Sequence, residues 1–392
     1  MAYTYPVKWI TSEMRGAPVL NGTPGTLIAV LDAFLLTGWG AAAAISVEVL
    51  DGVGTAIFNA GITFTQHAVV AISGATPAAL NGEARVLTSA SDRITFETDA
   101  PNGTATGSIV FKFAPQGGWE KAFSGTNKAV YRSTDVQSAK HCLRVDDAGT
   151  TTARVVGYET MSDVDSGVGP FPTAAQVSGG GYVHKSTVAS AQSIPYIFAA
   201  SASTALWSVR VGAGTWSAVT PGNLRGFGAA VALAPGGDAW ASFLSVSCSS
   251  SLNFFESGSL CGGPAGGVST GVTFMARGLS GLGSAVPVDA IPYMGTLSAL
   301  SGSDALMGAA PSVVDGAVYL SRVFLREVGG PPRAIVPGVA YVPQSGLQGF
   351  LTWGGIVQGG GEFSGRRLIA VTTGSYSASA YGIALIDITG PW

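Results

Sequence analysis

One glycine-rich motif and three histidines are the residues of this chain that could form a nucleophilic active site. Residues 267–271 (GVSTG) match the G-x-S-x-G pattern that places a serine nucleophile between a strand and a helix. In enzymes with that arrangement the histidine follows the serine, whereas His67, His141 and His184 all precede it. We therefore interpret the motif as a loop sequence and expect each histidine to be a satisfied or solvated residue.

Five carboxylates within one short region are the candidates for acid–base chemistry. Glycoside hydrolysis needs only two carboxylates, about 5 to 9.5 Å apart, so the sequence leaves this reaction open as an alternative. All five have turn-like neighbours, so we predict no enzymatic activity, no catalytic residue and no cofactor. They are Asp146, Asp147, Glu159, Asp163 and Asp165.

Asp163 and Asp165 also precede Gly167 with the spacing that begins a calcium-binding loop. The glutamate that ends such a loop is missing at the required offset. The sequence therefore favours a polar turn over a metal site.

The cysteines are Cys142, Cys248 and Cys261, and their spacing matches no paired zinc motif. Cys248 and Cys261 could bridge a loop, although synthesis in a cytoplasm favours buried or half-exposed thiols. The sequence does not decide whether these two pair.

Aromatic side chains are the candidates for binding a ligand or a partner. Trp207, Trp216 and Trp240 could stack on sugars, although tryptophan more often packs in a core or an interface. Phe254 and Phe255 lie in a Ser/Gly-rich stretch, Ser245 to Gly271, which we expect to be a long exposed loop. These two phenylalanines either anchor that loop or contact a partner.

The composition favours an all-β protein with a weakly polar surface. The 392 residues include 56 glycines, and only 11% are charged against 47% hydrophobic. The net charge of −3 provides no basic field, so a nucleic-acid partner is not expected. No apolar run is long enough to predict a membrane span, and the beginning of the chain lacks a signal-peptide pattern, so synthesis in a cytoplasm is expected.

The pattern of elements predicts four regions. Residues 1–44 should form an arm with aromatic anchors and one short helix, which Thr23 and Pro24 should begin and Gly38 should end. Residues 45–117 should form a small β-barrel or sandwich, and residues 118–178 a meander and a linker. Residues 179–392 should form a larger β-sandwich, with a propeller as the alternative.

The most decipherable architecture lies between Thr63 and Thr98. An apolar run is followed by turn signals and then by strand-like alternation, which predicts a compact antiparallel unit. The Asn81-Gly82 pair is typical of a tight hairpin turn, which we expect to set the register of this unit.

Part of this stretch, HAVVAISGATPAALNGEARVLTSASDRITFET, resembles a module of tailed-bacteriophage virion proteins. The opening VKWITSEMRGAPVLNGTPGTLIAVLDAFLLTGWG, the middle DVDSGVGPFPT and the end ALIDITGPW are similar to an uncharacterised family of structural proteins in siphophages and in Mu-like or lambda-like prophages. The resemblance implies a place in the virion, at the tail tip or baseplate, and it brings no catalytic residues.

The expected function is therefore that of a structural virion protein that links the tail to receptor-binding parts. Its expected partners are other virion proteins and further copies of itself, and a host cell-surface receptor is a further possibility. A receptor-binding protein of the tail, a head decoration protein and a tailspike-like enzyme that degrades glycans remain as alternatives.

Overall fold

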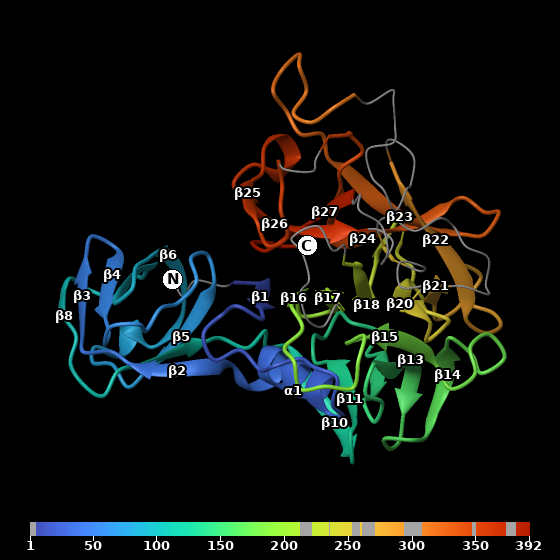
Figure 1. The fold of residues 1–392 in the computed structure, drawn as a ribbon, viewed down its shortest axis with the longest axis horizontal. Coiled ribbons are helices and arrows are strands. Elements are labelled where there is room, and N and C mark those ends of the chain that lie inside the picture. Colours follow the sequence, from blue (N-terminus) through green and yellow to red (C-terminus); the bar gives the residue numbers. More distant parts are fainter. Residues whose placement is uncertain are drawn as a thin grey trace.

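The chain folds into antiparallel β-sheets with one short helix, as the composition predicts (Figure 1). The computed structural model describes residues 5–211, 222–234, 236–252, 259–260, 271–293, 308–346, 350–373 and 382–392. Its strands form a small sheet, in the blue and teal lobe of Figure 1, and a much larger sheet in the rest of the molecule. Within these ranges, no helix is long and apolar enough to cross a membrane.

The small sheet is antiparallel and open, and several of its neighbouring strands are not consecutive in the sequence. Its strands run in the order β2-β9-β5-β6-β7-β4-β3-β8, and no pairing joins β2 to β8, so the barrel alternative is wrong. The strands alternate buried and exposed positions, because only one face of the sheet packs on a core of phenylalanine rings. The bounds are β2 Trp39–Ala43, β3 Ser46–Leu50, β4 Val53–Ile57, β5 Val69–Ser73, β6 Gly82–Ser89, β7 Arg93–Glu97, β8 Gly103–Thr104 and β9 Val110–Phe113.

The connection between β5 and β6 differs from the predicted tight turn. Ile72 pairs with Gly82, and residues 73–81 form a wider loop that contains the 3₁₀ turn Ala78–Leu80. Asn81 is extended, and its side-chain amide closes the loop by bonding the N–H (2.9 Å) and the carbonyl (2.8 Å) of Ala75. Asn81 therefore sets the register through its side chain instead of through a two-residue turn.

The large sheet contains the remaining described strands. Their bounds are β1 Lys8–Thr11, β10 Trp119–Gly125, β11 Lys128–Ser133, β12 Cys142–Asp146, β13 Thr152–Met161, β14 Gly167–Phe171, β15 Gly181–His184, β16 Tyr196–Ala200, β17 Thr204–Val209, β18 Arg225–Ala229, β19 Val231–Ala232, β20 Ser242–Ser247, β21 Gly271–Met275, β22 Val286–Pro292, β23 Ser321–Glu327, β24 Pro332–Tyr341, β25 Ile356–Gln358, β26 Arg367–Thr373 and β27 Gly382–Asp387.

The strands of the large sheet pair mostly in sequence order, and several of them are buried on both faces. The predicted meander is confirmed, since β10 to β13 pair consecutively, and a second ladder runs from β16 through β20 to β24. Strands β16, β17, β20 and β27 are buried at every position, because both of their faces are covered. These covered antiparallel layers are those of a sandwich, and the described pairings do not divide into the separate blades of a propeller.

Two loop predictions need correction. The exposed loop predicted from Ser245 begins later, because Ser245 and Ser247 belong to β20 and are fully buried. Residues 167–171, near the end of the region predicted to be a meander and a linker, form β14 and pair with β13.

The N-terminal arm packs against the chain's own sheet. Strand β1 pairs with β16, and the side chains of Tyr5 and Trp9 are buried. The small sheet begins at Trp39, inside the predicted arm, and strand β10 starts after two glycines with positive φ, Gly117 and Gly118.

The predicted short helix is present and packs on the β core, but it begins at a different residue. Helix α1 (Thr26–Asp32) continues as a π-helical turn (Ala33–Thr37) that Gly38 ends with φ 74°. Its N-cap is Gly25, with no capping side chain of its own, so the predicted start at Thr23 and Pro24 is wrong. The carboxylate of Asp147, 120 residues away, accepts the N–H of Leu27 (2.8 Å) in place of a local cap.

Candidate interaction surface

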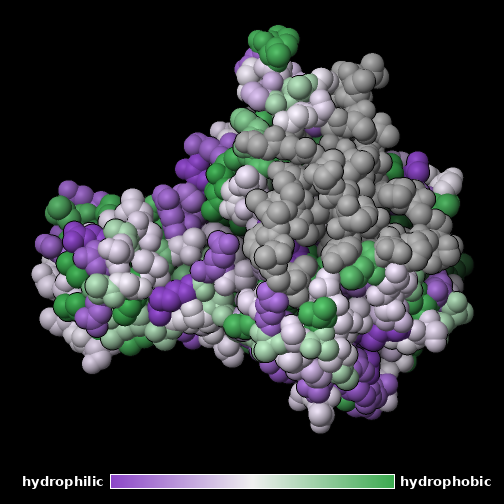
Figure 2. Space-filling model, in the orientation of Figure 1, coloured by the Kyte–Doolittle hydropathy of each residue, from purple (hydrophilic) through white to green (hydrophobic). Residues whose placement is uncertain are grey.

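A loop with exposed apolar side chains lies in the C-terminal region, between residues 308 and 320. It is the orange segment that projects from the molecule in Figure 1, and its tip is strongly hydrophobic in Figure 2. Val313 is 97% exposed and Val314 is 89% exposed. These two adjacent β-branched side chains place exposed apolar surface at the tip of the loop, which makes the tip a candidate contact for a partner.

Hydrogen bonds within the loop fix the position of this valine pair. The Ser312 and Ala317 backbones bond across the tip (2.8 Å), and the Ser312 hydroxyl accepts the N–H of Val314 (3.3 Å). The Asp315 carboxylate accepts the N–H of Ala317 (3.0 Å) and the hydroxyl of Tyr319 (3.3 Å). These bonds, led by the Ala317 N–H, lower the pKa of Asp315, so the carboxylate is ionised at neutral pH.

A buried glutamine holds the base of the loop. The side chain of Gln344 has no solvent exposure, and its oxygen accepts the N–H of Tyr319 (2.6 Å). Its amide nitrogen donates to the carbonyls of Ala309 (3.2 Å) and Ala317 (3.4 Å). One side chain therefore joins both sides of the loop to the core. Because these bonds restrict the loop, a partner that bound the valine pair would lose little affinity to ordering of the loop.

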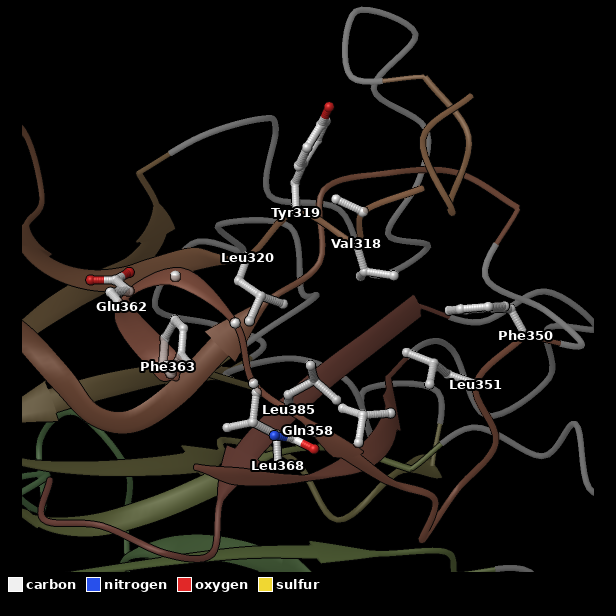
Figure 3. A pocket seen from close by; sticks show the side chains of 15 residues that line it. Val318, Tyr319, Leu320, Phe350, Leu351, Gln358, Glu362, Phe363, Leu368 and Leu385 are labelled. Atoms are coloured by element: carbon white, nitrogen blue, oxygen red, sulfur yellow. The ribbon is translucent and has the colours of Figure 1, made fainter. Parts of the chain in front are cut away.

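An apolar cavity of about 580 Å³ lies next to this loop. Figure 3 shows Leu320, Leu351, Phe363 and Phe350 around one hollow, whereas the carboxylate of Glu362 points away from it. The floor belongs to Leu368 and Leu385, which are about 1% exposed and form part of a separate core cluster. The cavity size lies in the range of ligand pockets, about 300–1,000 Å³, and its lining is mainly apolar, with Tyr319, Gln358 and Glu362 as its polar side chains.

The charged groups near the cavity are already paired. Arg322 forms an ion pair with Glu362, and Arg366 forms one with Asp387, which is buried. A partner at this surface would therefore gain mostly from covering apolar atoms.

The sequence-predicted partner contacts, Phe254 and Phe255, lie outside the described residues. Residues 267–270 of the serine motif, Trp216 and Cys261 also lie outside them. Among the residues that the structure does describe, no group of three or more His, Cys, Asp or Glu could hold a metal ion.

The five candidate carboxylates do not all converge on one site, although Asp146 and Asp165 meet at the guanidinium of Arg144. Asp146 pairs with Arg144, Asp165 with Lys128 and Arg144, and Asp147 with Lys185. Asp163 accepts the N–H of Asp165 (2.7 Å), which lowers its pKa. Glu159 lies in strand β13, contrary to its predicted turn, and binds Arg277 through both oxygens (2.6 and 2.7 Å). In these positions the carboxylates hold turns and strands together.

The three histidines are distributed over the fold. His67 lies in a turn of the small-sheet lobe with φ 66°, and His184 is buried at the end of β15. His141 stacks on Trp240 (6.2 Å between ring centroids), and the Arg277 guanidinium lies 4.2 Å from the centre of the same indole. Trp207 is buried in the core, so the packing interpretation applies to the two described candidate tryptophans.

Comparison with known proteins found no protein-family model that matches the chain and no similar curated protein.

Sequence reasoning missed Val313, Val314 and Gln344. The run PSVVDG places two valines between turn-forming residues, which could have been interpreted as an exposed apolar tip. No sequence signal identifies Gln344, because its partners are backbone groups brought near it by the fold.

Proposed function

We propose that this chain is a structural component of a tailed-phage virion that links the tail, at its tip or baseplate, to receptor-binding parts. The observation that carries an assembly role is the rigid loop that presents Val313 and Val314 beside an apolar cavity. A preformed apolar contact of this kind binds with little ordering cost. Its partners would be other virion proteins or further copies of this chain.

The place in a virion is supported by the sequence patches that resemble phage structural proteins, including the module between His67 and Thr98. The low charge and the all-β fold are compatible with it, since a weakly polar surface suits burial between subunits. Synthesis would take place in the host cytoplasm, and the working location would be the virion.

Mass spectrometry of purified particles tests the proposal. The chain is expected among the virion proteins, in a ratio to the tail proteins that matches a symmetric ring. Particles that contain all other tail proteins but lack this chain would contradict the proposal.

A further inference from the structure

A small cleft lies where three turns from distant parts of the sequence meet. The first includes Trp9 and Thr11 of strand β1 and the turn that follows it, residues 12–14. The second includes Thr65 of the small-sheet lobe, and the third includes residues 353, 354 and 356, at the start of β25. The cavity measures about 240 Å³, which is below the usual range for ligands of drug size. It has room for a single ring rather than for a peptide or an extended chain.

The cleft combines two indoles with polar groups that lack protein partners. Trp9 and Trp353 both line it. Within the part of the chain that the structure describes, the carboxylate of Glu13 and the hydroxyls of Thr11 and Thr65 make no hydrogen bond. The apolar cavity described above differs in this respect, because most of its lining is apolar.

The indole of Trp353 is fixed before any ligand arrives. The guanidinium of the buried Arg210 lies 5.2 Å from the centre of its ring. Trp9 is only 4% exposed, and its ring N–H approaches the carbonyl of His67 (3.4 Å). Rigid aromatic rings bind with a low entropic cost, since their rotamers are already restricted.

We propose that this cleft binds one neutral pyranose residue of a glycan. A pyranose has an apolar face of C–H groups that packs on an aromatic ring, and a rim of hydroxyls that needs both donors and acceptors. Trp353 provides the aromatic surface, Thr11 and Thr65 provide hydroxyls, and the carboxylate of Glu13 accepts charge-assisted hydrogen bonds. The same carboxylate repels acidic sugars, which selects for an uncharged ring.

This inference does not depend on the position of the chain in a particle. A sugar subsite would serve an adsorption protein in any assembly, and the residues that line the cleft include none from the loop between residues 308 and 320. Failure of sugar binding would therefore leave the proposed assembly role intact.

The test is a titration of the full chain with the methyl glycosides of glucose, galactose and mannose, with N-acetylglucosamine and with glucuronate. Saturation-transfer NMR detects binding, and calorimetry measures the dissociation constant. At least one neutral sugar is expected to bind in the millimolar range, with glucuronate at least about fivefold weaker.

Glu13 is exposed and Thr65 is half-buried, so their substitution should leave the fold intact. Glu13→Ala and Thr65→Val should each weaken binding about fivefold or more, because each removes a hydrogen bond to the sugar. Glu48→Ala removes a different exposed carboxylate, on strand β3, and should leave binding unchanged. Trp353→Ala should abolish binding, with its circular dichroism spectrum recorded to verify folding.

Two results would overturn the proposal. One is the absence of binding by every neutral sugar at about 50 mM, well above the expected dissociation constants. The other is a sugar whose affinity is the same for the wild-type chain and for the Glu13→Ala and Thr65→Val variants, since that sugar would bind elsewhere.

Discussion

Asp147 and Lys185 form an ion pair in which neither side chain has any solvent exposure. The same carboxylate receives the N–H of Leu27 at the start of helix α1, and the Lys185 ammonium also donates to the carbonyl of Thr23 (2.7 Å). The pair therefore joins the helix, the β12–β13 turn and the segment after β15.

Removal of one member of this pair should be strongly destabilising. Lys185→Met leaves a buried carboxylate without its counter-ion, which is expected to lower the free energy of unfolding by about 3–5 kcal/mol. The double variant Asp147→Asn/Lys185→Met removes both charges and should recover part of this loss. Urea denaturation measures the four stabilities of the cycle, and strictly additive effects would contradict a direct coupling.

Acid should destabilise the protein through His184. Burial, assisted by the nearby Arg225, lowers the pKa of His184 to about 4, against about 6.5 in the unfolded chain. Between about pH 6.5 and pH 4 the imidazole is protonated in the unfolded chain but neutral in the folded one, so the free energy of unfolding falls as the pH drops. Below about pH 4 both states bind the proton, and the free energy of unfolding levels off. The full loss is about 3 kcal/mol for this one group.

His184→Gln should flatten that part of the pH dependence. Chemical denaturation at several pH values between 7 and 4 gives the comparison. His67→Gln should change the slope less, because that ring is only half buried, although burial lowers its pKa as well. An equal pH slope for the wild-type chain and for His184→Gln would show that other groups cause the acid sensitivity.

Gly82 should tolerate a side chain poorly because of its backbone alone. Its φ is 135°, and a β-carbon there would meet no atom within 4 Å, so Gly82→Val adds strain without a clash. The substitution should lower the free energy of unfolding of the small sheet by about 1–3 kcal/mol and leave the rest of the fold intact. Gly360→Val is the matched control, because Gly360 has the same free space but φ −127°.

Calorimetry distinguishes the outcomes at Gly82. An early transition of the small sheet alone is expected for Gly82→Val and none for Gly360→Val. A single transition that moves as a whole would show that the small sheet unfolds together with the large one.

The elements that depend on local patterns could be predicted from the sequence. Alternation between apolar and polar residues predicts the strands of the small sheet. The spacing of apolar residues from Leu27 to Leu35 predicts the helix. The glycine that ends the helix, Gly38, was also predictable, since a positive φ there favours glycine.

The features that depend on distant residues could not be predicted. The start of the helix was placed wrongly because its cap is Asp147, which is far away in the sequence. Ser245 was placed in a loop because serine is common in turns, yet it lies in a strand that is covered on both faces. The cleft around Trp353 requires three separate turns to meet, which no local pattern encodes.

Gln344 should determine the rigidity of the valine-tipped loop. Gln344→Leu leaves the N–H of Tyr319 and two carbonyls without their partner, at an expected cost of about 1–3 kcal/mol. Hydrogen exchange should accelerate between Ala309 and Tyr319 before it does elsewhere. Unchanged protection of this segment would mean that the bonds of the loop itself are sufficient.

If Val313 and Val314 form an assembly contact, their replacement should remove this chain from purified particles, which quantitative mass spectrometry measures. Val136 is 91% exposed on a different loop, so Val136→Asp is the control for an added surface charge. Particles made with Val313→Asp/Val314→Asp should contain at least about tenfold less of this chain, because burial of the new carboxylates against a partner would weaken its binding. Particles made with Val136→Asp should contain wild-type amounts, and wild-type amounts of the double variant would contradict the account.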